Sequence, residues 1–355
     1  MALRNSASNA VLAKARAMYG RRLTGEDYRR LAACRTMPEL ALAMKALPMY
    51  AHTLAGVNPV FARRAQLEQQ LRQSMFDRYD SLCRFDMSAG DSVYRYFALY
   101  CEVEEITACL RYLDAGTPGE YLYRLPDFLQ HRVQIDLYKL AKVTDVKSLL
   151  HALRGTPYAA LLSPLKTADP ARGLLPQAER LLQDYRHKAL VALAPAVKQA
   201  GGYRAQPGVR EYLELECDIS ALTNAARLIK VKAPPHQIDL AARRDCTALT
   251  KAEWQDLLNS PTVEAFKQRL EQTRYAAALE YPGTVIKEKL QRYQFDWCRK
   301  WLRFSTDPTM VMLCYIELAQ SEVTNLNHII EGVHYHMPAD DLLPLLVGYD
   351  ETEVN

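Results

Sequence analysis

Residues 102–122 read EVEEITACLRYLDAGTPGEYL, and the pattern of this stretch occurs three times in the chain without a gap. Each copy begins with an acidic residue, continues with two apolar residues four positions apart, and places a proline twelve positions after the first of these two. The copies align Glu102, Glu105, Ile106, Leu110, Pro118 and Leu122 with Asp218, Ala221, Leu222, Ala226, Pro234 and Ile238, and with Glu322, Asn325, Leu326, Ile330, Pro338 and Leu342.

A second motif ends in a tyrosine and also has three copies, at residues 47–50, 155–158 and 272–275. Each tyrosine is followed four residues later by a leucine, in the pairs Tyr50 and Leu54, Tyr158 and Leu162, and Tyr275 and Leu279. A period of roughly 110 residues used three times predicts one architecture repeated around an axis.

The last acidic copy has no tyrosine motif after it, and the first tyrosine motif has only a weak acidic partner before it. The simplest resolution is a ring in which the C-terminal segment completes the unit that the N-terminal segment begins. We therefore expect three helical units related by pseudo-threefold symmetry, formed by residues 98–212, by residues 213–306, and by residues 1–97 together with 307–355.

Helical periodicity dominates the sequence, and no train of alternating strand segments is present. Asp145, Thr24 and Thr250 each precede an apolar periodic stretch, and their side chains are suited to cap the first turn of a helix. The sequence therefore predicts an all-α fold.

The composition limits the possible functions. The chain has 355 residues, of which 49% are hydrophobic, and a net charge of +4, so it can bury a large core and shows no concentrated basic surface for nucleic acid. No apolar stretch approaches the ~20 residues that span a bilayer. The first residues lack the apolar core of a secretion signal, and we expect a cytosolic protein or one on the cytosolic side of a membrane.

The first acidic copy carries two carboxylates, Glu102 and Glu105, which could form a general acid/base pair. The other copies do not keep this pair, so we favour a structural interpretation in which the acidic residue opens the helix or faces solvent. For the tyrosine motif we expect Pro157 to lie at the close of a helix and Tyr158 to pack with Leu162 into the next element.

Other candidate sites are weaker. The eight cysteines contain no C-x-x-C pair, and we interpret them as thiols of a reducing compartment. His334 and His336, near Glu331 and Asp340, could bind zinc, but no third ligand has a suitable spacing, so a polar loop is favoured. Residues 292–304 are basic and aromatic, and one amphipathic helix face explains them best. No nucleotide-binding or hydrolase motif is present, so we expect no catalytic residue, no cofactor, no metal and no bound nucleotide.

Residues 13–31 closely resemble the start of the C subunit of prokaryotic V/A-type ATPases, a family related to the d subunit of eukaryotic V-ATPases. The resemblance continues through residues 39–50, 149–158, 292–293, 319–326 and 337–338, and so covers essentially the whole chain. The chain departs from the family at two positions of the repeat. The family tends to keep an asparagine where this chain has Glu105, Ala221 and Asn325, so only the third copy keeps it. A basic residue is usual near the end of that helix, and it is kept as Arg111 and Arg227 but replaced by Glu331 in the third copy.

The resemblance implies a non-enzymatic coupling part, shaped as an all-helical, compact funnel with pseudo-threefold symmetry. Its implied partners are the rotor-shaft subunits, which seat in the funnel, and the membrane ring of proteolipid subunits on which it rests at the cytoplasmic face. It would be a central-stalk subunit through which torque passes between ATP turnover and ion transport.

We expect the loops after the three acidic copies to form one end of the funnel and to contact partners. The residues predicted to do so are Asp114, Lys230, Lys232, Glu331, His334 and His336. Two alternatives stay open at this point. One is a helical-repeat adaptor unrelated to the ATPase, and the other is a helical enzyme with an unrecognised site around His334 and His336.

Overall fold

The computed structural model describes residues 2–84, 90–130, 132–167, 174–192, 207–239 and 246–349. Within these ranges the chain forms α-helices and short 3-10 helices and contains no strand, which confirms the predicted all-α class. The chain divides into two compact units. The large unit comprises Met1–Asp86 and Ala194–Asn355, and the small unit comprises Met87–Leu193.

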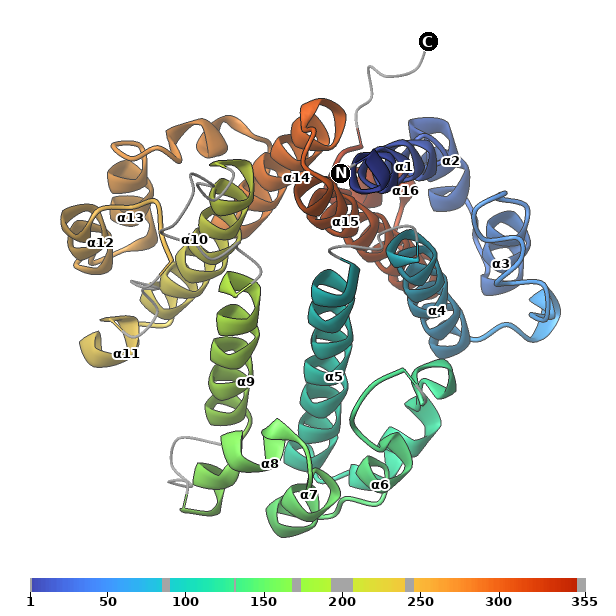
Figure 1. Ribbon diagram of the computed structural model, residues 1–355, viewed down its shortest axis with the longest axis horizontal. Coiled ribbons are helices and arrows are strands. Elements are labelled where there is room, and N and C mark those ends of the chain that lie inside the picture. The colour runs from blue at the N-terminus through green and yellow to red at the C-terminus, as the bar shows by residue number, and fades with distance from the viewer. Residues whose placement is uncertain are drawn as a thin grey trace. The chain divides into compact units, whose positions relative to one another are not determined.

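The large unit contains the first and last helices of the chain (Figure 1). Its α-helices are α1 (Ala2–Tyr19), α2 (Gly25–Ala32), α3 (Met37–Lys45), α4 (Arg64–Cys83), α10 (Pro207–Lys230), α11 (Pro235–Asp239), α12 (Lys251–Leu258), α13 (Val263–Leu270), α14 (Ile286–Phe304), α15 (Pro308–His334) and α16 (Ala339–Leu342). Its 3-10 helices are η1 (Pro59–Phe61), η6 (Ala276–Glu280) and η7 (Leu343–Leu345).

The small unit is built around two long helices that lie side by side, α5 (Gly90–Asp114) and α9 (Leu174–Val191) (Figure 1). The short elements between them are η2 (Pro118–Arg124), η3 (Asp127–Leu129), α6 (Leu137–Leu140), α7 (Val146–Ala152), α8 (Pro157–Leu161) and η4 (Ser163–Thr167). Pro157 begins α8 and does not lie at the close of a helix, so the sequence-based expectation for this residue is wrong. The missing N–H of proline is tolerated at the first helical position, where that group has no partner within the helix.

The three predicted N-caps are confirmed. Thr24 Oγ1 accepts from the backbone N–H of Asp27 at 3.2 Å, and Asp145 and Thr250 cap α7 and α12 in the same way. In each case the side chain of the third helical residue bonds back to the cap residue. These reciprocal bonds are local, which explains why sequence alone located them.

The large unit contains two clusters of buried apolar side chains. One joins the N-terminal helices to the C-terminal helices, with Leu31, Leu40 and Leu67 in the same cluster as Leu326 and Ile329. The other lies among the helices from α10 to α14. The two ends of the chain therefore share one core. The division of the whole chain into three units stays a prediction.

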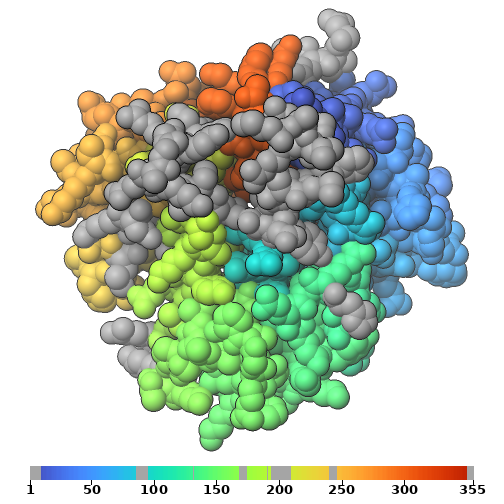
Figure 2. Space-filling model, viewed as in Figure 1, coloured from blue at the N-terminus to red at the C-terminus, as the bar shows by residue number. Residues whose placement is uncertain are grey.

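The surface of the N-terminal helices is the blue region of Figure 2. In α3 and η1, the apolar side chains of Leu42, Val60 and Phe61 are exposed. None of the described helices combines the length and the apolar character that a membrane span requires.

Candidate functional site

The three repeated acidic residues are buried in the interiors of long helices. Glu102 lies within α5, Asp218 within α10 and Glu322 within α15, and their exposed fractions are 3%, 0% and 6%. The expectation that these residues open helices or face solvent is therefore wrong. A carboxylate in such surroundings is costly unless hydrogen bonds satisfy it.

Each buried carboxylate accepts a hydrogen bond from the tyrosine of one copy of the second motif. We call these contacts the carboxylate–tyrosine pairs. The first is Glu102–Tyr158, the second is Asp218–Tyr275 and the third is Glu322–Tyr50, and the oxygen–oxygen distance is 2.6 Å in all three. The tyrosine rings are themselves buried. The two triplicated motifs are therefore the two halves of one repeated contact.

A backbone amide completes each pair. The N–H of Gln134 donates to Glu102, that of Ala248 donates to Asp218 at 2.9 Å, and that of Leu23 donates to Glu322 at 3.0 Å. Asp218 also accepts from the hydroxyl of Thr247, whose oxygen in turn accepts from Trp254 Nε1 at 2.9 Å. Each carboxylate thus fastens a long helix to a loop and to a tyrosine distant in sequence.

Burial also sets the protonation of the first two pairs. It raises the pKa of Glu102 and the pKa of Asp218 above their ordinary values, although the hydrogen bonds from Tyr158 and Thr247 act in the opposite direction. Burial, together with the neighbouring carboxylate, raises the pKa of Tyr158 and of Tyr275, so both hydroxyls stay protonated and donate.

The possible acid/base pair of the first copy is also explained by packing. Glu105 accepts from the Tyr121 hydroxyl at 2.9 Å, in the same unit in which Glu102 accepts from Tyr158. Both glutamates are buried, with 3% of each exposed. The two carboxylates are thus engaged by tyrosines within the core.

The third pair differs from the others because it contains an arginine. Arg78 on α4 donates to Glu322 Oε1 at 3.0 Å and to Tyr50 Oη at 3.2 Å, and its guanidinium lies 5.4 Å from the centre of the Tyr50 ring. The Arg78 side chain is only 10% exposed. This is a buried ion pair with a cation–π contact.

In the first two pairs, a second tyrosine packs on the tyrosine of the pair, as Arg78 does on Tyr50 in the third. Tyr185 on α9 packs edge-on against Tyr158, with ring centroids 5.6 Å apart, and Tyr293 on α14 packs edge-on against Tyr275 at 6.2 Å. Both tyrosines belong to the long helices that follow the tyrosine motif in sequence. Aromatic packing and a cation thus serve as alternatives beside the same contact.

The long helices of the three copies end with the same backbone geometry. The residue fourteen positions after the acidic residue has a positive φ in each case, 75° at Gly116, 53° at Lys232 and 57° at His336. The next N–H then donates back five residues, as from Thr117 to Tyr112 at 2.9 Å and from Met337 to Gly332 at 2.8 Å. This is a Schellman motif, and glycine is the residue that adopts it with least strain.

The predicted partner-binding residues lie at these helix ends. Asp114 is exposed at the end of α5, Lys230 and Lys232 are exposed at the end of α10, and His334 and His336 are exposed at the end of α15. Within the large unit, no hydrogen bond or ion pair among described residues joins the end of α10 to that of α15. The structure thus places each set at the end of its own helix.

Glu331 differs from the other predicted partner residues because it already has an intramolecular partner. Its Oε1 lies 2.6 Å from Arg64 Nη2 on α4. Neither His334 nor His336 belongs to a group of three potential metal ligands in the described part of the chain, and the His334 ring packs against Tyr335 with centroids 4.9 Å apart. The zinc hypothesis therefore gains no third ligand.

Exposed apolar side chains at the helix ends were missed by the sequence analysis. Beyond α5, Leu122 and Tyr123 are 53% and 86% exposed. Val231 after α10 is 67% exposed, and Tyr335 and Met337 after α15 are 69% and 41% exposed. A comparison of the second and third copies beside the turn would have indicated Val231 and Tyr335. Of these, Val231 and Tyr335 hold the same position in their copies, and apolar side chains exposed near one another are typical of surfaces that contact other proteins.

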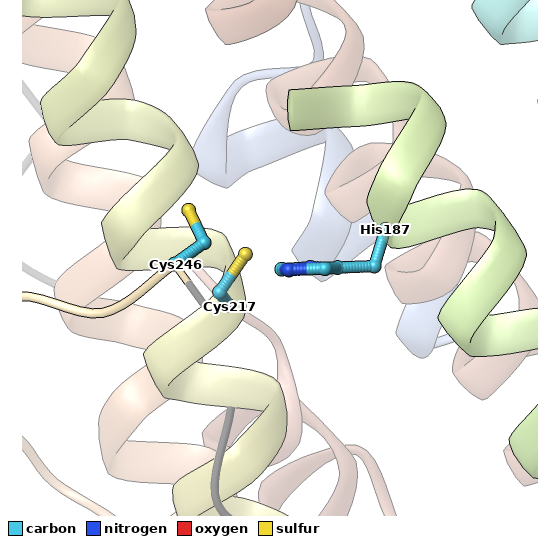
Figure 3. Close-up of side chains that lie close together, drawn as sticks. All are labelled: His187, Cys217 and Cys246. Carbon is cyan, nitrogen blue, oxygen red and sulfur yellow. The ribbon is translucent and has the colours of Figure 1, made fainter. Parts of the chain in front are cut away.

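None of the eight cysteines, all of which lie in described residues, forms a disulfide. In the large unit, Cys217 on α10 and Cys246 have Sγ atoms within 4.8 Å of one another (Figure 3). A hydrogen bond from Cys246 and burial raise the pKa of the Cys217 thiol, which stays protonated. Figure 3 also labels His187, which belongs to α9 of the small unit.

The fold and these contacts define an all-helical protein whose repeated acidic residues fasten its own helices together. The sequence profile of the ATP synthase (C/AC39) subunit family matches residues 11–343. The chain therefore belongs to this family, which contains the C subunits of V/A-type ATPases, and the resemblance noted from the sequence is confirmed. It is similar to the C subunit of the A-type ATP synthase of Methanocaldococcus jannaschii, with 24% identity over 298 residues that cover 79% of this chain and 72% of that protein.

Proposed function

We propose that this member of the C/AC39 family is a non-catalytic central-stalk subunit that couples the rotor shaft of a V/A-type ATPase to the proteolipid ring. It lies peripherally at the cytoplasmic face of the membrane. The shaft seats on one side of it and the ring on the other. Torque passes through it between ATP hydrolysis or synthesis and ion transport.

The observation that carries the proposal is the set of three carboxylate–tyrosine pairs in a member of this family. A coupling subunit must transmit torque without yielding. Hydrogen bonds to a charged group are stronger than those between neutral groups, and each buried carboxylate uses several of them to hold a long helix, a loop and a tyrosine motif together. The same bonds occupy the carboxylates that would otherwise be candidates for catalysis.

We further propose that the three helix ends are partner contacts. Asp114, Lys230, Lys232, His334 and His336 supply exposed polar groups there, and the exposed apolar side chains lie beside them. Such a mixture of polar groups and a few apolar anchors is typical of protein interfaces. Glu331 already pairs with Arg64 of α4, and because this ion pair is partly exposed, a partner can compete for the glutamate.

The coupling role is tested with purified ATPase complexes that contain or lack this chain. Without it, we expect the soluble head to keep its ATPase activity while ATP-driven ion pumping stops. Adding back the purified chain should restore pumping. Normal pumping by complexes that lack the chain would show that the proposal is wrong.

The partner contacts are tested by charge reversal. The double variant Lys230→Glu/Lys232→Glu should co-purify less with the shaft or ring subunits than the unmodified chain does. Lys300→Glu on α14 is the control, because it reverses the charge of an exposed lysine that is not at the end of α5, α10 or α15. Equal recovery of partners with the double variant and the control would exclude the end of α10 from the interface.

A further inference from the structure

A cavity of about 390 Å³ lies in the large unit beside the third carboxylate–tyrosine pair. Its walls come from the end of α1, the start of α2, the segment after α3, the helices α4, α14 and α15, and the segment after η7. The polar groups that matter for its chemistry belong to Arg22, Arg78, Arg299, Tyr28, Tyr315 and Glu322. All of these residues lie in one compact unit.

The charges lining this cavity are unbalanced. Three guanidinium groups face one carboxylate, that of Glu322. Glu322 already accepts from Tyr50 and Arg78 through one oxygen and from Leu23 through the other. The lining residues therefore leave an excess of positive charge, of which Asp296, outside the lining, offsets the part that Arg299 carries.

The two outer arginines are more exposed than Arg78. Arg22 is exposed, lies 4.6 Å over the Tyr19 ring, and forms no ion pair with any described residue. Arg299 contacts Asp296 at 3.0 Å, and both side chains are more than a third exposed. An exposed ion pair of this kind is weak, so a ligand can compete for the guanidinium.

Tyrosine hydroxyls provide neutral donors in the same cavity. Tyr315 is 3% exposed, and its hydroxyl donates to no described residue; the Arg78 guanidinium lies close enough to donate to its oxygen, which leaves the hydroxyl proton for a ligand. Burial raises the pKa of Tyr315 to about 12, so the hydroxyl keeps its proton. Tyr28 Oη accepts from Asn325 Nδ2 at 3.3 Å, which leaves its own proton to donate.

We propose that this cavity binds a small molecule that carries a phosphate group. Guanidinium forks match the oxygens of a phosphate, and tyrosine hydroxyls can satisfy the oxygens that the arginines do not reach. Met18, Met49 and Phe295 form an apolar part of the wall, against which an organic group can pack. The volume is within the range of small-molecule sites.

The proposal is tested by calorimetric titration of the isolated full chain with inorganic pyrophosphate at physiological ionic strength. We expect one saturable site. Arg299→Gln should weaken binding at least tenfold, and Tyr315→Phe, which keeps the shape of the side chain, should weaken it several-fold. Arg303→Gln is the control, because it removes the same charge one turn further along α14 and outside the cavity.

Two further arms identify the ligand. Malonate carries two negative charges without phosphate oxygens and should bind at least tenfold more weakly than pyrophosphate. Co-sedimentation with phosphatidylglycerol vesicles, compared with phosphatidylcholine vesicles, separates a lipid headgroup from a soluble phosphate compound as the source. Binding of pyrophosphate or of phosphatidylglycerol vesicles supports the site if Arg299→Gln weakens it.

The proposal is overturned if neither pyrophosphate nor the anionic vesicles bind, if Arg299→Gln and Arg303→Gln weaken binding equally, or if malonate binds as well as pyrophosphate. These measurements use the chain without shaft or ring subunits. A negative result therefore leaves the proposed coupling function unaffected.

Discussion

The third and the first carboxylate–tyrosine pairs solve the same problem in different ways. In the large unit, Glu322 accepts from Tyr50, from the Leu23 amide and from the guanidinium of Arg78. In the small unit, the described partners of Glu102 are Tyr158 and the Gln134 amide. The third pair balances its buried charge with a cation, whereas the first has only neutral donors and a glutamate whose pKa is raised by burial.

This difference shows which part of the contact the fold requires. All three pairs keep a tyrosine hydroxyl and a backbone amide on the carboxylate, while the neighbouring group is Arg78 in one pair and a tyrosine ring in the others. The donors are therefore the constant part of the contact. The cation is an addition that makes the third pair depend on charge balance, and it also places a guanidinium at the wall of the cavity.

The largest expected effect is that of Glu322→Gln. This change leaves the buried Arg78 without its counter-charge, and breaking a buried ion pair in this way costs about 3–5 kcal/mol. Glu102→Gln is the matched variant in the pair without a cation, and there we expect a loss of about 1–2 kcal/mol. Urea denaturation of both variants measures the difference, and equal losses would show that Arg78 does not distinguish the two pairs.

The tyrosine hydroxyls provide the next test. Tyr158→Phe leaves Glu102 with the Gln134 amide, and the loss of a hydrogen bond to a charged group should cost about 1.5–3 kcal/mol. Tyr50→Phe should cost less, because Glu322 keeps both Arg78 and Leu23 as donors. Thermal denaturation gives the order of the two variants. A larger loss for Tyr50→Phe would contradict the comparison.

The dependence of stability on pH is a further, smaller test. Because burial raises the pKa of Glu102 above its ordinary value of 4.5, the folded state holds this proton more tightly than the unfolded state does. The associated stability is present below the ordinary pKa and is lost as pH rises through the raised value. Glu102→Gln should therefore make the urea midpoint fall less between acidic and neutral pH, whereas Glu120→Gln, an exposed site in the same unit, should leave the profile unchanged.

The smallest effect concerns the helix ends, where glycine at one end can be compared with lysine at another. Lys232 has a φ of 53°, and a left-handed backbone costs a non-glycine residue about 1–2 kcal/mol. Glycine removes this strain but adds about 0.5–1 kcal/mol of conformational entropy to the unfolded chain. Lys232→Gly should therefore be more stable than the unmodified chain by about 0.5–1 kcal/mol. Lys232→Ala removes the same side chain without relieving the strain. If alanine stabilised as much as glycine, the effect would come from the lost charge.

The helices could be predicted because their signals are local. Thr24, Asp145 and Thr250 bond to residues three positions away, so the caps are visible in any window of the sequence. The equal spacing of the three acidic copies likewise indicated that their helices have equivalent ends. The positive φ at Gly116, Lys232 and His336 falls at one common offset.

The buried position of the acidic residues could not be predicted in the same way. A single aspartate or glutamate in a helix is more often exposed, and only a distant donor makes its burial tolerable. That donor lies 56 residues away for Glu102 and 272 residues away for Glu322. Both halves of the contact were identified as repeats, but no local pattern connects one to the other.

The sequence by itself determined the all-α class, the helix caps, the repeat and the family, because these depend on periodicity, on short-range hydrogen bonds and on an ordered set of residues along the chain. Only the tertiary structure decided what the repeated residues do. Folding brings each carboxylate to a tyrosine hydroxyl, adds Arg78 to one of the three pairs, and leaves a basic cavity beside it. These are consequences of contacts between distant parts of the chain, and their free energies depend on burial.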